Sequence, residues 1–257
     1  MTAAAHTWFM FGRHVRNLVR QPVWIVILLV QPFFWLVLYS QLFRRITDLP
    51  GFETRSYIEF LTPGIVVMTA FFSGIWNGMS MVNDLDRGII ERFLATPARR
   101  SSLVLGHVGQ CSLNAVIQGA IVLGIGFLMG ARVREGALGW LVILVAASLV
   151  AACFSGVSNG IALFTRREES MIAVSNFVGL PLLFFSSALI ARDLIPEWME
   201  VAARFNPVEW GVVAAREVVE PGTDWGVVGF YLALLVAATI ATSAFATWSF
   251  RVYRRTL

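Results

Sequence analysis

Lysine is missing from this chain of 257 residues, and all 20 of its cationic side chains are arginine. This absence excludes a nucleotide-binding loop of the Walker A type, which needs a lysine among its glycines. Charged residues make up only 14% of the chain, whereas an ordinary soluble domain carries about a quarter. We therefore expect neither ATP hydrolysis by that chemistry in this chain nor the fold of a soluble enzyme.

Other reactive residue types are few and scattered. Cys111 and Cys153 lie in apolar stretches without a neighbouring histidine or carboxylate, so we expect buried free thiols. His6, His14 and His107 are too far apart in the sequence to indicate a ligand cluster. The sequence therefore predicts no catalytic site, no metal site and no cofactor bound by this chain.

Hydrophobic residues dominate instead, at 57% of the chain, with a mean hydropathy of +0.71. Windows of about 20 apolar residues predict six membrane-spanning helices. These run near Val23–Leu42, Leu61–Met81, Leu103–Met129, Leu138–Phe164, Met171–Ile190 and Val227–Phe250. None of them shows the strict alternation of a barrel strand. The prediction is an all-α membrane protein that forms one domain over residues 1–257.

The arginines are unevenly divided between the two sides of such a membrane protein. Twelve fall on one side and eight on the other, and the acidic residues are divided five against eleven in the opposite sense. The positive-inside rule then predicts that both termini are cytoplasmic. Membrane-facing arginines also explain the pI near 9.7 without nucleic acid. A lysine-free, arginine- and alanine-rich chain is typical of a high-GC bacterium, so the expected location is the bacterial plasma membrane.

Residues 1–22 precede the first predicted span, and apolar side chains interleave there with Arg13, Arg16 and Arg20. The apolar run that follows is too long for a signal peptide. The pattern predicts an interfacial amphipathic helix that lies along the inner leaflet, in contact with membrane lipids.

The densest charge lies in residues 82–102, between the second and third predicted spans. Four apolar residues recur there at helical spacing with charges on the other faces: Ile89, Ile90, Phe93 and Leu94. A short amphipathic helix outside the membrane suits docking of a soluble partner, so we predict a cytoplasmic coupling loop. In the alternative interpretation, Glu91 and Arg92 pair only within their own helix. Arg166-Arg167-Glu168-Glu169 is a second, smaller cytoplasmic candidate, or simply a solvated turn.

Residues 191–225 are too polar to span a membrane and too apolar for a free loop. Asn206-Pro207-Val208-Glu209 has the pattern of a capping box, and Pro196 begins an earlier helical turn. We expect two short helices that either dip into the outer leaflet and return, or lie on the surface. A dipping hairpin would form an outer gate, with the candidate residues Pro196, Trp198, Asn206, Pro207 and Glu209.

No Asp, Glu or Arg lies well inside a predicted span, which argues against an ion-coupled carrier. The uncharged polar residues inside the spans have two open interpretations, interhelical hydrogen bonds or contacts along a substrate path. The candidate substrate path consists of Gln31, Phe72, Trp76, Asn77 and Asn176.

Two blocks of the sequence resemble those of the type-2 ABC exporter permeases, in particular the daunorubicin-resistance type. The first block consists of Asp84, Arg87-Gly88, Glu91-Arg92-Phe93-Leu94-Ala95-Thr96-Pro97 and Arg100, followed by Leu103 and Gly106. The second consists of Phe184-Phe185-Ser186-Ser187-Ala188-Leu189-Ile190, Ile195-Pro196-Glu197-Trp198, Asn206-Pro207-Val208 and Arg216. Both blocks keep the order and spacing of that family.

The resemblance implies a permease that works with a separate cytosolic ATPase subunit, on which ATP and Mg²⁺ would be bound. It also implies pairing with a second copy or a paralogue, and extracellular re-entrant helices. The implied cargo is an amphipathic drug, antibiotic or lipid that is exported, with a polysaccharide or other envelope precursor as the alternative. From the residues alone, a non-ABC membrane sensor or scaffold also stays open. The residues implied in ATPase coupling are Asp84, Arg87, Gly88, Glu91, Arg92, Phe93, Leu94, Thr96, Pro97 and Arg100.

Overall fold

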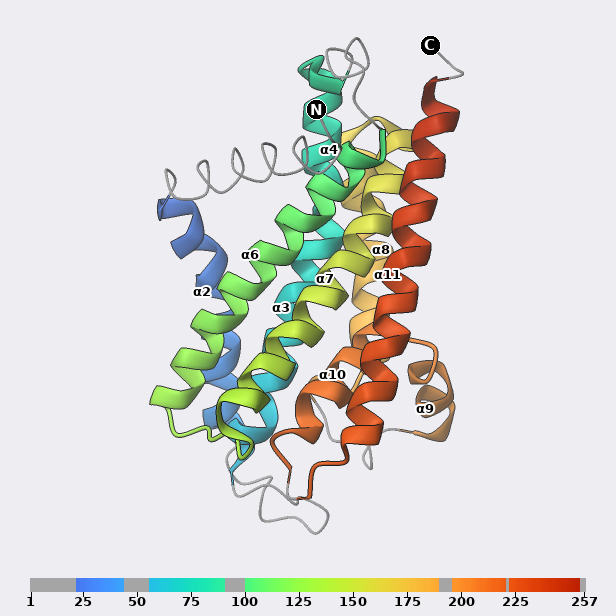
Figure 1. The fold of residues 1–257 in the computed structure, drawn as a ribbon. Helices are drawn as coiled ribbons and strands as arrows, with labels where there is room; N and C mark the ends of the chain where they lie inside the picture. The colour runs from blue at the N-terminus through green and yellow to red at the C-terminus, as the bar shows by residue number, and fades with distance from the viewer. Residues whose placement is uncertain (1–21, 44–55, 91–99, 190–195, 221, 255–257) are drawn as a thin grey trace.

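The structure is a computed structural model, and it describes residues 22–43, 56–90, 100–189, 196–220 and 222–254. Within these residues the regular elements are all α-helices, packed into an elongated bundle (Figure 1). They are α2 (Pro22–Leu42), α3 (Tyr57–Trp76), α4 (Gly78–Asp86), α6 (Arg100–Leu128), α7 (Gly136–Thr165), α8 (Glu168–Phe184), α9 (Glu197–Ala203), α10 (Pro207–Glu217) and α11 (Trp225–Arg254). The predicted all-α class is confirmed.

Four helical segments of the described chain are long and apolar enough to cross a membrane: Tyr57–Asp86, Leu103–Leu128, Gly136–Thr165 and Trp225–Val252. They coincide with the second, third, fourth and sixth predicted spans. The first and fifth predicted spans fall on α2 and α8, and their crossing of the membrane stays a prediction. The predicted interfacial helix lies outside the described residues, except for Pro22, which begins α2.

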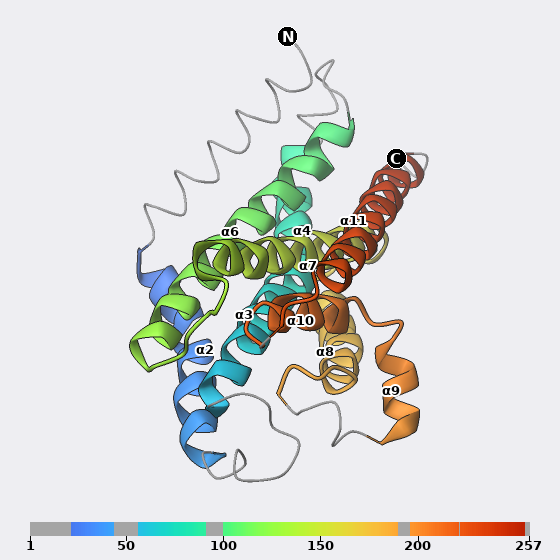
Figure 2. The same ribbon diagram turned by 60° about the horizontal axis from the view of Figure 1, so that its bottom comes forward.

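Helix α7 occupies the centre of the bundle and packs against α3, α6, α10 and α11 (Figure 2). Many of the buried side chains of α7 are small, among them Ala146, Ala147 and Ala151, which are fully buried. Small residues allow neighbouring helix backbones to approach closely inside a membrane. A Cβ added to Gly156 would lie 2.7 Å from the hydroxyl of Thr242, which shows how closely α11 approaches α7.

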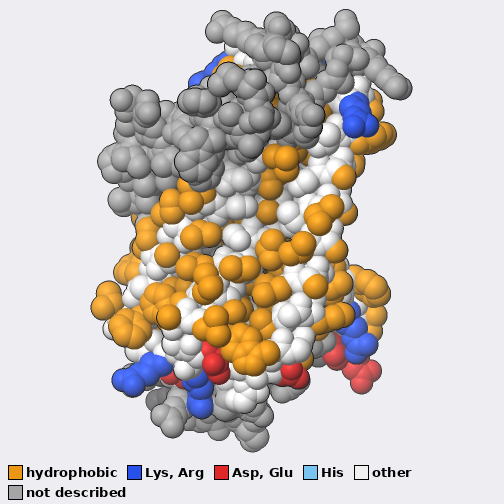
Figure 3. Space-filling view, viewed as in Figure 1, with side chains coloured by type: hydrophobic (Ala, Val, Ile, Leu, Met, Phe, Trp, Pro, Cys, Tyr) orange, Lys and Arg blue, Asp and Glu red, His pale blue; other side chains and the backbone are white. Residues whose placement is uncertain are grey.

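The outer surface of the bundle is divided by side-chain type. Figure 3 shows apolar side chains over the middle of one face, with arginine and acidic side chains gathered at the end where α9 and α10 lie. Large apolar residues are strongly exposed on α8, where Phe177 is 84% and Phe184 68% accessible. An apolar belt with charges at its edge is typical of a protein surrounded by lipid.

Candidate functional site

At the end of the bundle that contains α4, polar side chains connect three helices. Nε2 of His107, on α6, lies 3.3 Å from a carboxylate oxygen of Asp84, and both side chains are largely buried. The side-chain amide of Asn83 donates to Glu168, at the start of α8, at 2.8 Å. The smaller cytoplasmic candidate, Arg166-Arg167-Glu168-Glu169, is thus in contact with the helix that leads into the predicted coupling loop.

A buried apolar cluster lies under these polar contacts. It joins α4, α6, α7, α8 and α11 with the segment that follows α4, and consists of Met81, Val82, Ile90, Leu103, Ala162, Leu163, Met171 and Phe250. Ile90 lies within the predicted coupling loop, residues 82–102, and is fully buried in this cluster. The segment around Ile90 therefore packs in a cluster to which five helices contribute.

Helix α4 ends at Asp86, two residues before a glycine at which the chain turns. Asp86 and Arg87 are exposed, and Gly88 has a φ of 63°, a conformation that glycine adopts without steric cost. The chain is helical again at Ile89 and Ile90. The other residues of the predicted coupling set, Glu91, Arg92, Phe93, Leu94, Thr96 and Pro97, lie outside the described residues. Arg100 begins α6, but its side chain is not among the described ones.

At the opposite end of the bundle, Asn206 joins α10 to α8. Its side-chain oxygen accepts from the backbone N–H of Val208 at 3.0 Å, with Pro207 at the first helical position, which confirms the predicted N-cap. Its amide nitrogen donates to the carbonyls of Leu182 and Phe185, at 2.6 and 2.9 Å. These two carbonyls lie at the C-terminal end of α8, where the helix itself provides no donors.

The same contacts explain why α8 stops at Phe184, six residues before the end of the predicted fifth span at Ile190. Hydropathy alone predicts that the helix continues through the apolar residues that follow. In the structure, the hydroxyl of Ser186 donates to the carbonyl of Leu183 at 2.7 Å, and the chain then bends toward α10. Polar side chains thus end the helix inside an apolar stretch.

Glu209 lies on the buried face of α10, where its carboxylate accepts two hydrogen bonds from one residue. The backbone N–H of Ser187 donates to Oε2 at 2.6 Å, and the Ser187 hydroxyl donates to Oε1 at 3.1 Å. The predicted capping box is therefore wrong in its second half. The carboxylate of Glu209 does not accept a hydrogen bond from the backbone N–H of Asn206. That N–H donates instead to the carbonyl of Ala203 at 2.9 Å.

Arg216, two turns further along α10, completes this buried network. Its guanidinium donates to the hydroxyl and the carbonyl of Ser187, at 3.2 and 2.8 Å, and lies 3.7 Å above the ring of Phe60 on α3. Burial lowers the pKa of Arg216 to about 10, and the nearby Glu209 acts against this shift. The side chain therefore stays cationic at neutral pH, and the network holds one buried charge of each sign.

The residues predicted for an outer gate therefore lie in two different environments. Asn206 and Glu209 are buried and bind to the end of α8 and to Ser187 just after it, and Pro207 is half-buried at the first position of α10. Pro196 and Trp198 are exposed at the start of α9, and Trp198 makes an edge-to-face contact with Phe185, with ring centroids 5.9 Å apart. The structure confirms two short helices in this region, α9 and α10.

The helix that connects the two ends of the bundle is interrupted once, between α3 and α4. The hydroxyl of Ser158 donates to the carbonyl of Ile75 at 2.6 Å and accepts from the N–H of Gly78 at 2.9 Å. Ser175, on α8, donates to the same carbonyl. Side chains that insert into the backbone ladder are a known cause of helix breaks. The amide of Asn77, at the break, donates to Ser155 at 2.8 Å.

Only part of the candidate substrate path is brought together. Phe72, Trp76 and Asn77 follow one another along α3 and the break, and all three are half-buried. Asn176, on α8, is exposed and donates to the carbonyl of Ile172 in its own helix. Gln31, on α2, is exposed. For Asn77 the structure supports an interhelical hydrogen bond, and no described contact joins Gln31 or Asn176 to the other three residues.

Sequence reasoning did not identify the buried network around Ser187 or the hydroxyls at the helix break. Glu209 and Arg216 are seven residues apart, so they lie on the same helical face, which is also apolar. Two opposite charges on one apolar helical face were a signal from which a buried charge network could have been predicted. Ser158 and Ser175 had no such signal, since serines are common inside membrane helices. No group of metal-binding side chains occurs among the residues that the structure describes.

Comparison with known proteins gives matches over most of the chain. The family described as "ABC-2 type transporter" matches residues 5–219. The daunorubicin resistance ABC transporter permease protein DrrB1 of Streptomyces coeruleorubidus is 26% identical over 261 residues, covering 98% of this chain and 87% of that protein. The putative transport permease ycf38 of Cyanophora paradoxa is 26% identical over 78% of this chain and 69% of its own length. The inner membrane transport permease YadH of Escherichia coli K12 is 25% identical over 76% of this chain and 75% of its own length.

Proposed function

This chain belongs to the ABC-2 type transporter family, and from that premise we propose that it is the permease subunit of an ATP-driven exporter. As a member of the family it is a multi-pass membrane transport protein rather than an enzyme. In the proposal, ATP and Mg²⁺ are bound by a separate cytosolic ATPase subunit, because this chain has no lysine for a Walker A loop. The permease lies in a bacterial plasma membrane with both termini in the cytoplasm.

One observation carries the proposal: the segment Tyr57–Asp86 connects the two candidate sites directly. It has 30 residues, so as a helix it is about 45 Å long. Near its start, Tyr57 donates to the carbonyl of Leu189 at 3.0 Å, and Phe60 lies under Arg216. At its other end, Asp84 lies beside His107. Asp84 is already part of the predicted coupling loop, residues 82–102.

In this mechanism, ATP binding closes two partner ATPases, and residues 82–102 carry their movement into the permease. The buried position of Ile90 supports this role, because it joins the loop to five helices. Glu91 and Arg92 make the charged contacts with the ATPase, and Phe93 and Leu94 anchor the interface. The bundle then responds by rigid-body rocking, which in packed helices occurs between discrete arrangements.

The proposed cargo is an amphipathic drug, antibiotic or lipid, taken from the cytoplasm or the inner leaflet. The drug-resistance name of the relative from Streptomyces supports this class. The exposed aromatic side chains on α2 and α8, such as Phe33, Phe34 and Phe177, suit a partly apolar molecule. Export of a polysaccharide or other envelope precursor is the alternative. Two permease chains, identical or paralogous, would form the complete pathway.

The first test is binding of the ATPase. The permease is purified together with an ATPase encoded beside it, and the double variant Glu91→Arg/Arg92→Glu is compared with Arg251→Glu. Arg251 is an exposed arginine of α11, and the preceding residue, Phe250, packs in the cluster that contains Met81 of α4. We expect the double variant to lose most of the ATPase and Arg251→Glu to keep it. If all forms retain the ATPase equally, residues 82–102 are not the coupling element.

The second test is transport. The complex is reconstituted into vesicles, and ATP-dependent movement of labelled drugs, lipids and oligosaccharides is followed from the side on which ATP is added. Movement of an amphipathic compound away from the ATPase side supports export. Movement of an oligosaccharide alone supports the alternative cargo, and movement of any compound toward the ATPase contradicts export.

A further inference from the structure

The turn between α6 and α7 forms a pocket that no step of the proposed transport uses. Its wider part has a volume of about 730 Å³ and is lined by Phe127, Gly130, Arg132, Val133, Ala137 and Trp140, among others. This size falls within the range of about 300 to 1,000 Å³ that is typical of small-molecule sites. We call it the α6–α7 pocket.

One wall of the α6–α7 pocket is aromatic. The rings of Phe127 and Trp140 meet edge to face, with centroids 6.0 Å apart, and Phe127 is 58% exposed. A Cβ added to Gly130 or to Gly136 would meet nothing within 4 Å, so the protein leaves open space beside the turn. An exposed aromatic wall next to open space can accept an apolar chain.

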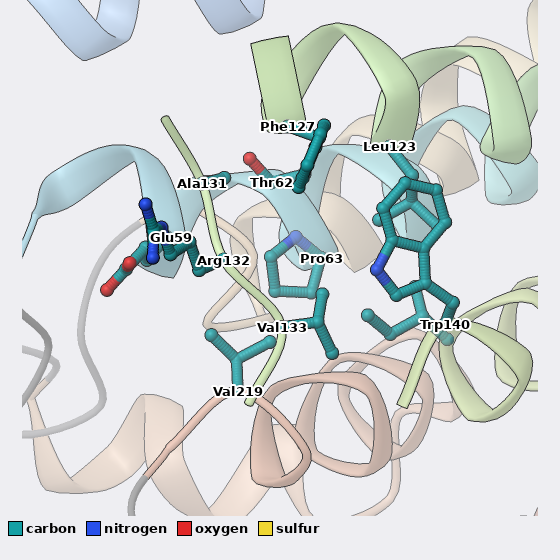
Figure 4. Close-up of a pocket in the computed structure, with 11 residues that line it drawn as sticks. Glu59, Thr62, Pro63, Leu123, Phe127, Ala131, Arg132, Val133, Trp140 and Val219 are labelled. Atoms are coloured by element: carbon teal, nitrogen blue, oxygen red, sulfur yellow. The ribbon is translucent and has the colours of Figure 1, made fainter. Parts of the chain in front are cut away.

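Two opposite charges line the other side. A narrow recess of about 10 Å³ adjoins the wider part and is lined by Glu59 as well as by Arg132 (Figure 4). A recess of this size holds at most one water molecule, so a larger polar group must stay at its mouth. Neither Glu59 nor Arg132 forms an ion pair with any residue that the structure describes. Because both side chains line the recess, a polar group at its mouth would lie near both charges.

The pocket lies at the ends of two long apolar helices. Helix α6 ends at Leu128 and α7 begins at Gly136, and Trp140 is four residues, or about 6 Å, further along α7. Tryptophan at this distance from the end of a span is typical of the boundary between hydrocarbon and head groups. A molecule in the pocket would have its polar part among head groups and its apolar part toward the hydrocarbon.

We propose that the α6–α7 pocket binds one phospholipid whose zwitterionic head group carries a primary ammonium, as in phosphatidylethanolamine. Arg132 binds the phosphate, Glu59 accepts from the ammonium, and Phe127 and Trp140 contact the start of an acyl chain. A lone arginine would prefer an anionic head group. The added carboxylate disfavours a net negative lipid and selects one that can donate to it.

Native mass spectrometry tests this on the full-length permease, stripped of lipid and then given equal amounts of phosphatidylethanolamine, phosphatidylcholine and phosphatidylglycerol. The wild type should retain phosphatidylethanolamine roughly tenfold above the other two, the ratio that corresponds to one charge-assisted hydrogen bond. Glu59→Gln should abolish this preference, whereas Glu197→Gln, at an exposed position on α9, should keep it.

Arg132→Gln should reduce retention of all three lipids, whereas Arg134→Gln, in the same turn but outside the pocket lining, should retain them. Arg132→Lys keeps the positive charge, so this variant should still retain phosphatidylethanolamine. Its comparison with Arg132→Gln distinguishes loss of the charge from loss of the fold. Preference for phosphatidylglycerol, or equal retention by Arg132→Gln and Arg134→Gln, would overturn the proposal. The measurement needs neither ATPase nor cargo, so its outcome is independent of the export test.

Discussion

Ser187 and Glu209 are bound to each other by two hydrogen bonds, one from the serine backbone at 2.6 Å and one from its hydroxyl at 3.1 Å. Because Arg216 donates to the same serine, one residue holds a buried carboxylate and a buried guanidinium together. Buried charges are tolerated when they are paired and hydrogen-bonded, and are costly when one partner is removed. Substitutions in this network should therefore be among the most damaging in the chain.

Glu209→Ala should destabilise the protein by about 3 to 5 kcal/mol, because Arg216 would keep its charge in a buried site without the carboxylate. Glu209→Gln should cost less, since the amide oxygen can still accept from Ser187. Thermal unfolding of the purified protein in detergent measures both. The control is Glu197→Ala, at an exposed position of α9. An equal loss in Glu197→Ala and Glu209→Ala would contradict the role given to the network.

Asn206 allows its two functions to be separated. Asn206→Asp keeps the oxygen that caps α10 but loses the amide donor to Leu182 and Phe185, whereas Asn206→Ala loses both. Loss of the cap alone costs about 1 kcal/mol, so we expect Asn206→Ala to reduce the free energy of unfolding by more than that.

Transport measurements on Asn206→Ala and on Pro207→Ala test whether this region is an outer gate. A gate should show altered turnover, or ATP hydrolysis without export, in Asn206→Ala and Pro207→Ala at normal protein level. Unchanged coupled transport in both variants would leave Asn206 and Pro207 with a structural role only.

Gly78 should not tolerate a methyl group. A Cβ at this position would lie 2.5 Å from the Ser158 hydroxyl and 2.6 Å from the Ser158 carbonyl oxygen, at the break between α3 and α4. Overpacking of this kind costs about 1 to 3 kcal/mol, so Gly78→Ala should lower the unfolding temperature. Gly124→Ala, on α6, is the matched control, because a Cβ there meets nothing within 4 Å. If the two variants unfold alike, the close approach of α7 at Gly78 is not required.

The predicted topology can be tested with single cysteines in a background without Cys111 and Cys153, both of which are buried. Cysteines at positions 135 and 200 should react with a membrane-impermeant thiol reagent added to intact cells, and a cysteine at position 167 should react only after lysis. All three positions are at least partly exposed in the structure. Labelling at position 167 in intact cells would reverse the proposed orientation.

Hydropathy predicted the helices well where they consist of long apolar runs, as in α6, α7 and α11. It failed at the end of α8, because the residues after Phe184 stay apolar while Asn206, 20 or more positions away in the sequence, takes the last helical carbonyls. It also did not predict the break at Asn77, which depends on the hydroxyls of Ser158 and Ser175 on other helices. Contacts between distant segments carry no local signature.

In the candidate sites, too, local contacts were predictable from the sequence and contacts between distant segments were not. The N-cap at Asn206 was predictable, because it depends on residues that are adjacent in the sequence. The hydrogen-bond partner of Glu209 was not predictable, because Ser187 lies on another segment and the local sequence pattern indicated a capping box. The contact between Asn83 and Glu168 likewise joins α4 to the start of α8, two segments that were predicted as separate cytoplasmic candidates. Residue types identified the polar groups, and only the packing identified their partners.

The central position of α7 has a consequence for how the protein is made. Helices α2, α3, α4 and α6 precede α7 in the chain, and α3 and α6 each bury part of their inward face against it. During synthesis these helices therefore enter the bilayer before their principal partner exists. Until α7 is inserted, Asn77 and the carbonyl of Ile75 have neither Ser155 nor Ser158 to bind. A nascent chain that stops after α6 should remain loosely packed and be a target for membrane proteases.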